Sequence, residues 1–517
     1  MAKSIMVQGT MSNAGKSLIA AGLCRVFKQD GYSVAPFKSQ NMALNSYVTA
    51  DGLEMGRAQV MQAEAAGIAP DVRMNPVLLK PSSDTGSQVI VMGEILCDMN
   101  ASDYHHYKKS LMPRVREAYN SLASSYDIIV LEGAGSPAEI NLKDGDIVNM
   151  GMAREVNAPV LLAGDIDRGG VFAQLYGTVA LLEEEERKFF RGLIINKFRG
   201  DKTLLMPGVR MLEDRVNIPV VGVLPYGRLD LDDEDSLSDR IENRRGTAGE
   251  TKVDLVVIRL PHLSNFTDFN VFSQIPGVSL RYVLHPGQLS EPDMILLPGT
   301  KNTMGDLKWL YSMGFVEKIQ DYHEKGGVVF GICGGYQMMG ERLKDPEGVE
   351  GGGEEKGLGL LPMETLFTPD KRRTQVEGKI LSLPGVLSGL SGMEVSGYEI
   401  HMGQMIKGED KVCPAVQIRD LKNGNSSMDG VATERAYGSY VHGFFDAPMV
   451  AFRIAQILAE RKGIDLDDPG ETGEAPLAHK EKQYDLLADL IRENLDMEAI
   501  YRILEEGVPD VHKDQSH

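Results

Sequence analysis

Residues 5–27 read IMVQGTMSNAGKSLIAAGLCRVF, an apolar run followed by a turn and then by an Ala- and Leu-rich stretch. This order predicts a strand, a loop and a helix, and the letters GKS at the turn are typical of a phosphate-binding loop. Backbone N–H groups of such a loop bind phosphate oxygens together with the helix N-terminus. The first glycine stands one residue further out than usual, since Thr10 occupies its place. The predicted nucleotide-binding residues are Gly9, Thr10, Ser12, Asn13, Ala14, Gly15, Lys16 and Ser17.

Further polar residues are candidates for the same site. In such loops the lysine reaches the terminal phosphates and the hydroxyl ligates Mg²⁺, so we assign these roles to Lys16 and Ser17. Glu132 ends the apolar run DIIVLE and is the candidate for a second Mg²⁺ ligand, although an acid that caps a loop fits the same pattern. Asp51 is a weaker candidate ligand. Asn196 ends another apolar run, where its amide would either pair with an adenine edge or serve only as a turn residue.

Short apolar runs alternate with helical stretches through residues 1–227. This alternation predicts βαβ units and an α/β domain with a doubly wound parallel sheet covered on both faces. Ligands bind such sheets at the carboxyl ends of the strands. The predicted strands are 5–8, 33–37, 127–131, 159–163, 192–196 and 220–224.

The rest of the chain divides into three parts. Residues 228–252 hold five acids within LDLDDED (229–235) and no apolar period, which predicts an acidic linker. Residues 253–450 repeat the α/β pattern and predict a second domain, and helical apolar spacing in residues 451–517 predicts a packing tail. The predicted strands of the second domain are 253–260, 294–297, 327–332 and 438–441.

A nucleophilic cysteine is predicted in GGVVFGICGGYQMMG (326–340). Glycines flank Cys333 at a strand-to-helix turn, which leaves room for a substrate carbonyl beside the sulfur. A helix N-terminus also favours the thiolate form of a cysteine. The backbone N–H groups of Gly299 and Gly334 are candidates for an oxyanion hole, and His442, directly after an apolar strand, is the candidate base.

Composition excludes several classes of protein. The 517 residues include 54 basic and 74 acidic side chains, and a net charge of −20 argues against a nucleic-acid partner. We expect a cytoplasmic protein with no membrane partner, because no apolar run reaches the ~18 residues of a membrane helix and the first residues lack a signal-peptide pattern. Four distant cysteines without a CxxC pair argue against disulfides and structural zinc. The oligomeric state stays open.

A nucleotide site and a Cys/His site in one chain have a simple joint explanation. Thiolate attack on the side-chain amide of glutamine releases ammonia, and ATP activates a carboxylate that the ammonia then attacks. The residues therefore favour a glutamine-dependent amide ligase.

Longer stretches of the sequence support a family resemblance. GTMSNAGKS, GICGGYQMMG and YGSYVHGFFD, together with PFKSQNMALNSYVT, EGAGSPAEINL, GDIDRGGVFA and GYEIHMGQ, resemble the cobyric acid synthase family, the glutamine-dependent amidases of the corrin ring. The resemblance covers residue 1 to about residue 450. It implies an N-terminal domain similar to dethiobiotin synthetase and a C-terminal domain similar to class I glutamine amidotransferases. It also implies that ATP, L-glutamine and adenosylcobyrinic acid a,c-diamide are the substrates, and that the b, d, e and g carboxylates become amides.

The family pattern implies individual roles as well. It makes Cys333 the nucleophile and His442 its base, and it places Asp146 near the bound carboxylate. Class I amidotransferases usually carry an acid two residues after the histidine, where this chain has Phe444. The group that orients His442 is therefore left open, with Asp446 a weak candidate.

Two alternatives remain at this point. Cobyrinic acid a,c-diamide synthases share both domains and amidate earlier carboxylates, although PFKSQNMALNSYVT and GDIDRGGVFA favour the b, d, e, g enzymes. A regulatory P-loop ATPase of the partitioning type also has an unusual loop, but that interpretation gives the Cys333 turn no purpose.

Overall fold

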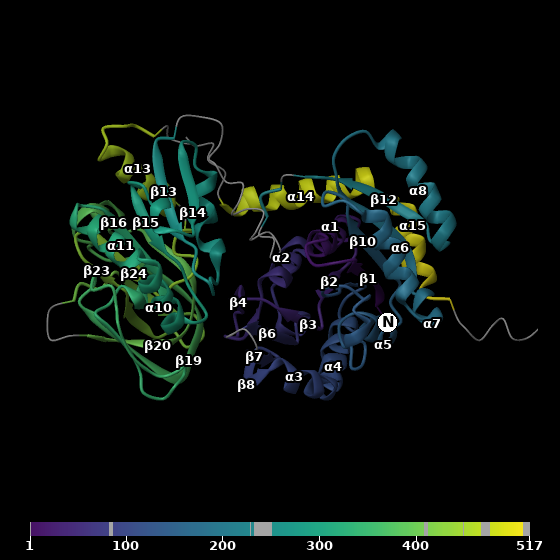
Figure 1. Cartoon of the computed structure of the whole chain (residues 1–517), viewed down its shortest axis with the longest axis horizontal. Helices are drawn as coiled ribbons and strands as arrows, with labels where there is room; N and C mark the ends of the chain where they lie inside the picture. The colour runs from purple at the N-terminus through teal and green to yellow at the C-terminus, as the bar shows by residue number, and fades with distance from the viewer. Residues whose placement is uncertain are drawn as a thin grey trace, which may run out of the picture. The chain divides into compact units, whose positions relative to one another are not determined.

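The computed structural model describes residues 2–81, 86–227, 229–231, 251–407, 412–447, 449–466 and 476–509. The chain divides into two compact units, whose elements are labelled in Figure 1. The first comprises Met1–Ala43, Met55–Leu237 and Leu477–His517, and the second comprises Leu44–Glu54 and Ser238–Pro476.

A six-stranded sheet, parallel throughout, forms the centre of the first unit. All six strands predicted for this region are confirmed, and they are almost wholly buried because helices cover both faces. In sheet order the strands are β12 (Val220–Pro225), β11 (Phe190–Phe198), β10 (Val160–Asp165), β1 (Lys3–Gly9), β9 (Ile128–Glu132) and β2 (Val34–Phe37). The helices include α1 (Lys16–Gln29), α2 (Arg57–Ala66), α4 (Met112–Ala123), α5 (Met150–Glu155), α6 (Val171–Leu181) and α8 (Lys202–Val216).

Two C-terminal helices complete the core of the first unit. They are α14 (Pro476–Asn494) and α15 (Met497–Glu506). Leu487 and Ile491 of α14 belong to the same buried cluster as α1. A Cβ on Gly22 of α1 would lie 2.5 Å from Ile491 Cγ1, so the close approach of the two helices requires a glycine there. The tail expected to contribute packing therefore supplies part of this core, whereas α13 (Val450–Glu460) belongs to the second unit.

A second α/β sheet lies in the second unit. Its strands are parallel except for the edge strand β23. The four strands predicted from the sequence correspond to β13, β15, β16 and β24. The sheet order is β14 (Val278–Val283), β13 (Val253–Ile258), β15 (Met294–Leu297), β16 (Val328–Ile332), β24 (Ala436–Ser439) and β23 (Val431–Ala432). The helices are α10 (Thr303–Met313), α11 (Phe315–Glu324) and α12 (Gly334–Met338), with the 3₁₀ segment η5 (Phe266–Gln274).

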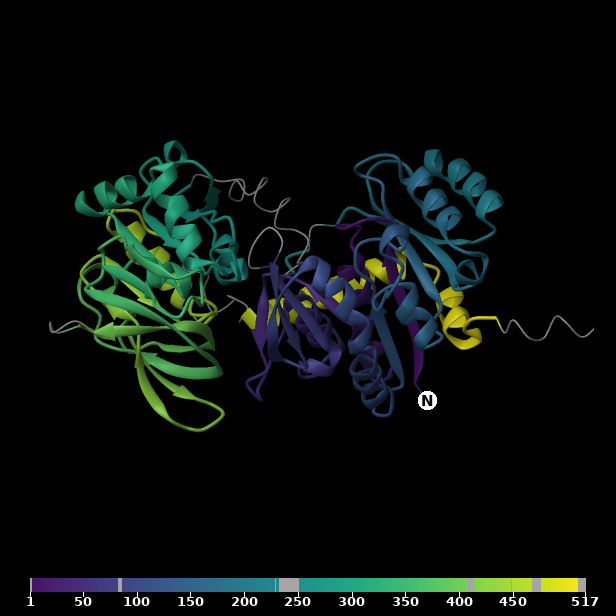
Figure 2. The ribbon, with the colours of Figure 1, turned by 60° about the horizontal axis from the view of Figure 1, so that its bottom comes forward.

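The second unit also contains a largely antiparallel sheet. Figure 2 shows its strands, in green, gathered on one side of the unit, with the teal helices of the same unit on the other. Its longest strands, β19 (Met363–Ile380) and β20 (Glu394–Lys407), pair with each other. The other strands are β17 (Arg342–Asp345), β18 (Gly353–Lys356), β21 (Val416–Asp420) and β22 (Ser426–Asp429).

Short strands of residues 40–100 form two further sheets. One is β3 (Gln40–Met42), β6 (Val77–Pro81), β7 (Gly86–Val91) and β8 (Glu94–Asn100), in that order. The other pairs β4 (Ser46–Val48) with β5 (Glu54–Gly56). The predicted acidic linker 228–252 falls outside the described residues except for 229–231 and 251–252. Among the described residues, no helix combines the length and apolarity that a membrane crossing needs.

Candidate functional site

The phosphate loop joins β1 to α1, as the sequence predicts. Gly15 has φ 86° and Asn13 has φ 63°, values that turn the backbone sharply before the helix begins. The Lys16 side chain folds back over the loop, where Nζ donates to the carbonyl oxygens of Met11 at 2.9 Å and Gly135 at 3.3 Å. A Cβ on Gly9 would lie 3.0 Å from Lys16 Cδ, so this glycine leaves space for the lysine. The ammonium group is therefore held at the mouth of the loop, where phosphates bind in such sites.

Glu132 lies at the end of β9 in a fully buried polar network. Its Oε1 accepts from Ser17 Oγ and from Lys38 Nζ, each at 2.8 Å. Its Oε2 accepts from Gln62 Nε2 at 2.6 Å and from Gln59 Nε2 at 3.3 Å. Burial raises the pKa of Glu132, but the charge and hydrogen bond of Lys38, with help from Gln62 and Lys16, outweigh it and lower the pKa. Glu132 is therefore a carboxylate, one hydrogen bond away from the Ser17 hydroxyl.

The remaining candidates of this site have different surroundings. Asn196, at the end of β11, donates through Nδ2 to the Ala14 carbonyl at 2.9 Å, so its amide is tied to the phosphate loop. Asp51 is exposed in the turn between β4 and β5 and belongs to the second unit, whereas Ser17 and Glu132 belong to the first. A role for Asn196 at the adenine edge and a role for Asp51 as a metal ligand remain predictions.

Asp146 binds backbone N–H groups at the start of α5. Its Oδ1 accepts from Val148 N at 2.8 Å and Asn149 N at 2.9 Å, and its Oδ2 accepts from Gly151 N at 2.8 Å. A carboxylate at a helix N-terminus is favoured by the helix dipole. In this structure Asp146 therefore orders the loop that leads into α5.

A cavity of about 400 Å³ joins these groups in the first unit. Lys16 and Ser12 of the phosphate loop line one part of it, and Asp146 and Lys143 line another. Lys38 and Lys108 add two further cationic groups. The lining also contains three acids, Glu139, Asp146 and Glu186, so its four lysines give it a small local excess of positive charge in a chain with a net charge of −20.

Cys333 lies at a strained turn between β16 and α12. Its φ of 49° and ψ of −110° are unusual for a residue with a side chain, and such strain concentrates at functional sites. Its N–H donates to the Ser439 carbonyl at 2.9 Å, and Sγ lies 3.6 Å from the Ile400 carbonyl oxygen. A Cβ on Gly335 would lie 2.1 Å from the Leu297 carbonyl oxygen, so the turn packs too closely for any other residue.

His442 follows β24 and is 1% exposed. Its Nδ1 lies 2.7 Å from Asp268 Oδ2, and Asp268 Oδ1 accepts from Gly443 N at 3.0 Å. Asp268 comes from η5 and takes the orienting role for which the sequence offered no acid. Asp446 is exposed, and Phe444 packs on Phe330 with ring centroids 5.2 Å apart. No local pattern signals Asp268, because it lies 174 residues before His442.

Electrostatics favour the protonated form of His442. Burial lowers the pKa of its imidazole, but the charges of Asp268 and Cys333 and the hydrogen bonds to both outweigh burial and raise the pKa to about 10. A protonated imidazole beside a cysteine sulfur can donate a hydrogen bond to it, as in sites with a nucleophilic cysteine. The arrangement is therefore that of an activated Cys–His pair oriented by a carboxylate.

The two predicted oxyanion glycines lie beside these groups. Gly334 is the first residue of α12, so its N–H is among those that a helix leaves without a backbone acceptor. A Cβ on Gly299 would lie 3.0 Å from His442 Cε1. Both glycines therefore adjoin the Cys333–His442 pair, and oxyanion stabilisation by their N–H groups remains a prediction.

The other three cysteines lack this environment. Burial, with the charge of Glu132, raises the pKa of Cys24 far above its usual value, so this thiol stays protonated. Burial also raises the pKa of Cys97, which lies on β8. Cys413 lies 3.7 Å from the Ser382 carbonyl oxygen. Cys333, in contrast, adjoins His442.

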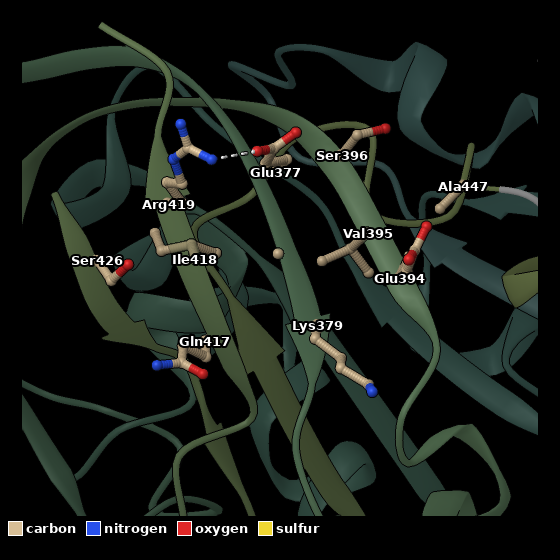
Figure 3. A pocket seen from close by; sticks show the side chains of 11 residues that line it. Glu377, Lys379, Glu394, Val395, Ser396, Gln417, Ile418, Arg419, Ser426 and Ala447 are labelled. Carbon is tan, nitrogen blue, oxygen red and sulfur yellow. Dashed lines mark hydrogen bonds and ion pairs between the residues drawn. The ribbon is translucent and has the colours of Figure 1, made fainter. Parts of the chain in front are cut away.

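A hollow of about 580 Å³ lies elsewhere in the second unit, against β19, β20 and β21 (Figure 3). Arg419 and Glu377 form an ion pair at 3.3 Å on neighbouring strands, and Lys379 extends away from that pair (Figure 3). None of the residues predicted to form a site lines this hollow.

Comparisons with known proteins match both parts of the chain. A family model described as a CobQ/CobB/MinD/ParA nucleotide binding domain matches residues 5–234, and one described as a CobB/CobQ-like glutamine amidotransferase domain matches residues 254–450. A cobyric acid synthase of Lachnoclostridium phytofermentans is 57% identical over 519 residues, which cover 98% of this chain and 100% of the relative. A cobyric acid synthase of Ruminiclostridium cellulolyticum is 55% identical over 513 residues, with 98% of each chain covered. A solved structure of PurLQS from Thermotoga maritima aligns with 45% of this chain and 97% of its own at 18% identity and a TM-score of 0.28, too low to add to the assignment.

Proposed function

The chain belongs to the cobyric acid synthase family, and from that premise we propose that it amidates the b, d, e and g carboxylates of adenosylcobyrinic acid a,c-diamide. It is an ATP-binding amide ligase with a glutamine amidotransferase domain, and it acts in cobalamin biosynthesis. Each amide consumes one ATP and one glutamine. The observation that carries the proposal is the Cys333–His442–Asp268 arrangement in a chain that also holds the Ser17–Glu132 phosphate site.

Glutamine hydrolysis begins at Cys333. The thiolate forms a bond to the side-chain amide carbon, the C–N bond breaks, and His442 gives its Nε2 proton to the departing nitrogen, which leaves as ammonia. Neutral His442 then takes a proton from water as the water oxygen attacks the thioester carbon. The C–S bond breaks, which releases the thiolate and a carboxylic acid, and the acid loses its proton to solvent to give glutamate. Asp268 stabilises the imidazolium throughout, and the N–H groups of Gly299 and Gly334 would stabilise the oxyanion.

ATP activates the acceptor at the phosphate loop. A corrin carboxylate oxygen attacks the γ-phosphorus, ADP leaves, and ammonia then displaces phosphate from the acyl carbon, with loss of a proton from nitrogen. Lys16 holds the terminal phosphates, and the lysine-lined cavity with Asp146 receives the anionic substrate. Mg²⁺ fits the Ser17 hydroxyl and the ionised Glu132, because Mg²⁺ binds few protein oxygens together with substrate phosphates, and it would neutralise phosphate charge.

Mass spectrometry of the corrinoid product tests the proposal. The protein is incubated with ATP, Mg²⁺ and glutamine whose side-chain amide carries heavy nitrogen, and with either cobyrinic acid or its adenosylated a,c-diamide. We expect four labelled amides on the diamide and none on cobyrinic acid. Two labelled amides on cobyrinic acid would instead identify an a,c-diamide synthase and overturn the proposal.

A further inference from the structure

Residues 44–54 of the N-terminal half take no part in glutamine hydrolysis or ATP use as proposed. The stretch NSYVT lies in residues Leu44–Glu54, here called the strap. The strap belongs to the second unit, although the chain on both sides of it, up to Ala43 and from Met55, belongs to the first. A segment of the nucleotide-binding half of the sequence is thus part of the unit that holds Cys333.

Specific contacts hold the strap in the second unit. Val48 is buried in one apolar cluster with Tyr398 and Ile400 of β20. Gln375 of β19 donates through Nε2 to the Val48 carbonyl at 2.9 Å. Lys371 Nζ lies 2.6 Å from Glu54 Oε2, and the side chains of this ion pair are 9% and 0% exposed. Buried, paired groups of this kind fix a segment in one position.

The strap reaches the catalytic histidine through Asn265. Ser46 N donates to Asn265 Oδ1 at 3.0 Å, and Asn265 Nδ2 lies 3.3 Å from His442 Nε2. Because the amide oxygen is occupied by the Ser46 N–H, the amide NH₂ must face the imidazole. Asn265 is 3% exposed and has φ 51° and ψ 42°, a left-handed conformation that asparagine tolerates better than most residues.

A tyrosine connects the same two elements by a second route. Tyr398 OH donates to the Ser46 carbonyl at 3.0 Å, so both backbone groups of Ser46 have partners in the active-site region. The Tyr398 ring stacks on the His442 ring, with centroids 5.3 Å apart and planes 24° apart. The position of Ser46 and the position of the imidazole are therefore linked through two side chains.

The direction of the Asn265 amide has a chemical consequence. An NH₂ group only donates, so it can hydrogen-bond Nε2 only when that nitrogen carries a lone pair. That state is the neutral tautomer with its proton on Nδ1, facing Asp268. The titratable groups around His442 are Asp268 from η5, Cys333 from the turn after β16, and Tyr398 from β20. Asp268 and Cys333 favour the imidazolium, and Asn265 favours the neutral base.

We propose that Asn265 is a positioning residue for His442 and that the strap, through the Ser46 N–H, sets the direction of its amide. This position of Asn265 assists proton transfer from His442, because a histidine that holds its proton too tightly is a poor donor to the departing nitrogen. By opposing the charges of Asp268 and Cys333, Asn265 keeps the Nε2 proton transferable. The inference rests on glutamine hydrolysis at Cys333 and is independent of which corrinoid is the acceptor.

Asn265→Asp tests the first half of the proposal. The new carboxylate retains an acceptor for Ser46 N and tolerates the left-handed backbone, but it faces Nε2 with an oxygen instead of an NH₂. We expect kcat for glutamate release to fall about tenfold or more, KM for glutamine to change little, and both limbs of the pH profile to move to higher pH. The variant should retain amide synthesis with ammonium in place of glutamine, and this activity would show that the protein is correctly folded. An unchanged kcat and pH profile would overturn the proposal.

Tyr398→Phe tests the role of the strap. This variant keeps the ring on His442 and removes the hydrogen bond to the Ser46 carbonyl. The matched control is Tyr437→Phe, because Tyr437 OH also hydrogen-bonds backbone groups, the oxygens of Pro384 at 2.9 Å and Glu434 at 2.7 Å and the N–H of Leu387 at 3.0 Å, none of which belongs to the strap. We expect glutamate release to fall severalfold, with a shifted pH profile, in Tyr398→Phe only. Equal behaviour of the two variants would overturn the part assigned to the strap, and a wild-type protein that releases no glutamate would instead refute the proposed function.

Discussion

The two reactive sites both lie at the carboxyl ends of parallel strands, but they are built differently. At the phosphate loop, residues 9–17 are consecutive, and Glu132 ends the neighbouring strand β9. At the thiol site, Cys333, His442 and Asp268 come from three separate segments. Phosphate is bound by backbone N–H groups, which one loop can supply, whereas a nucleophile, its base and an orienting acid need three side chains.

Each site also uses a buried carboxylate in a different way. Lys38 keeps Glu132 ionised beside the Ser17 hydroxyl, where we propose that the two side chains bind Mg²⁺. Asp268 instead keeps His442 protonated and oriented. In the proposed function one carboxylate binds a metal ion and the other orients a histidine, so removing each should impair a different reaction.

Replacing the nucleophile should give the largest effect. In Cys333→Ser the hydroxyl is far less nucleophilic than a thiolate, so glutamine-dependent synthesis should fall by about a thousandfold or more. Synthesis with high ammonium should persist, since it requires only the phosphate site. The measurement is the rate of amide synthesis with glutamine and, separately, with ammonium as the nitrogen source. A parallel loss of both activities would show that the two sites are not separable as described.

Replacing Glu132, the acid of the phosphate site, should have the second-largest effect. Glu132→Gln leaves Lys38 buried beside a neutral partner, which should cost about 3–5 kcal/mol of unfolding free energy and abolish ADP formation. Chemical denaturation and an ADP assay measure the two effects.

The control is the double variant Glu132→Gln with Lys38→Met, which also removes the buried cation beside the neutral glutamine. It should recover much of the stability but none of the ADP formation. Recovery of ADP formation would contradict a role for Glu132 at the nucleotide.

Asp268→Asn should affect only the thiol site. Without the carboxylate the pKa of His442 falls from about 10 toward its ordinary value, so imidazolium is lost at lower pH. The alkaline limb of glutamate release should move to lower pH, and kcat should fall about a hundredfold. The pH dependence of glutamate release is the measurement, with Asp446→Asn as the matched control. An unshifted alkaline limb would rule out Asp268 as the orienting group.

The smallest effect is expected at a cysteine outside the reaction. Cys24→Ala removes a buried sulfur from the first unit, at a cost of about 1 kcal/mol of unfolding free energy. Glutamine-dependent synthesis should stay within about twofold of the wild-type rate. Modification with iodoacetamide should label Cys333 and spare Cys24 in the folded protein. Protection of both thiols would mean that Cys333 is not activated.

The sequence predicts the parts of the molecule that follow local rules. The parallel strands are short apolar runs, and the loop ending at Ser17 and the glycines around Cys333 lie within single stretches of chain. The antiparallel strands β19 and β20 were not predicted, because their polar and apolar residues pack according to partners distant in sequence.

Asp268 and Asn265, at the thiol site, could not be predicted from the sequence for the same reason. They lie 174 and 177 residues from His442, and nothing in the segment around them marks either as a partner of a histidine. The strap is even harder to predict from the sequence, because strands of three residues, such as β4, are too short to show a periodic pattern. Its position depends on contacts with β19 and β20, which were themselves not foreseen.

In the proposed function Cys333 releases from glutamine the ammonia that the ATP-dependent reaction adds to the corrinoid. The most direct measurement is isotopic competition, in which glutamine with heavy amide nitrogen and unlabelled ammonium are both present during synthesis. The account predicts heavy nitrogen in the new corrin amides made by the wild-type protein and only light nitrogen in those made by Cys333→Ser. Heavy nitrogen in the product of the variant, or none in the product of the wild type, would contradict it.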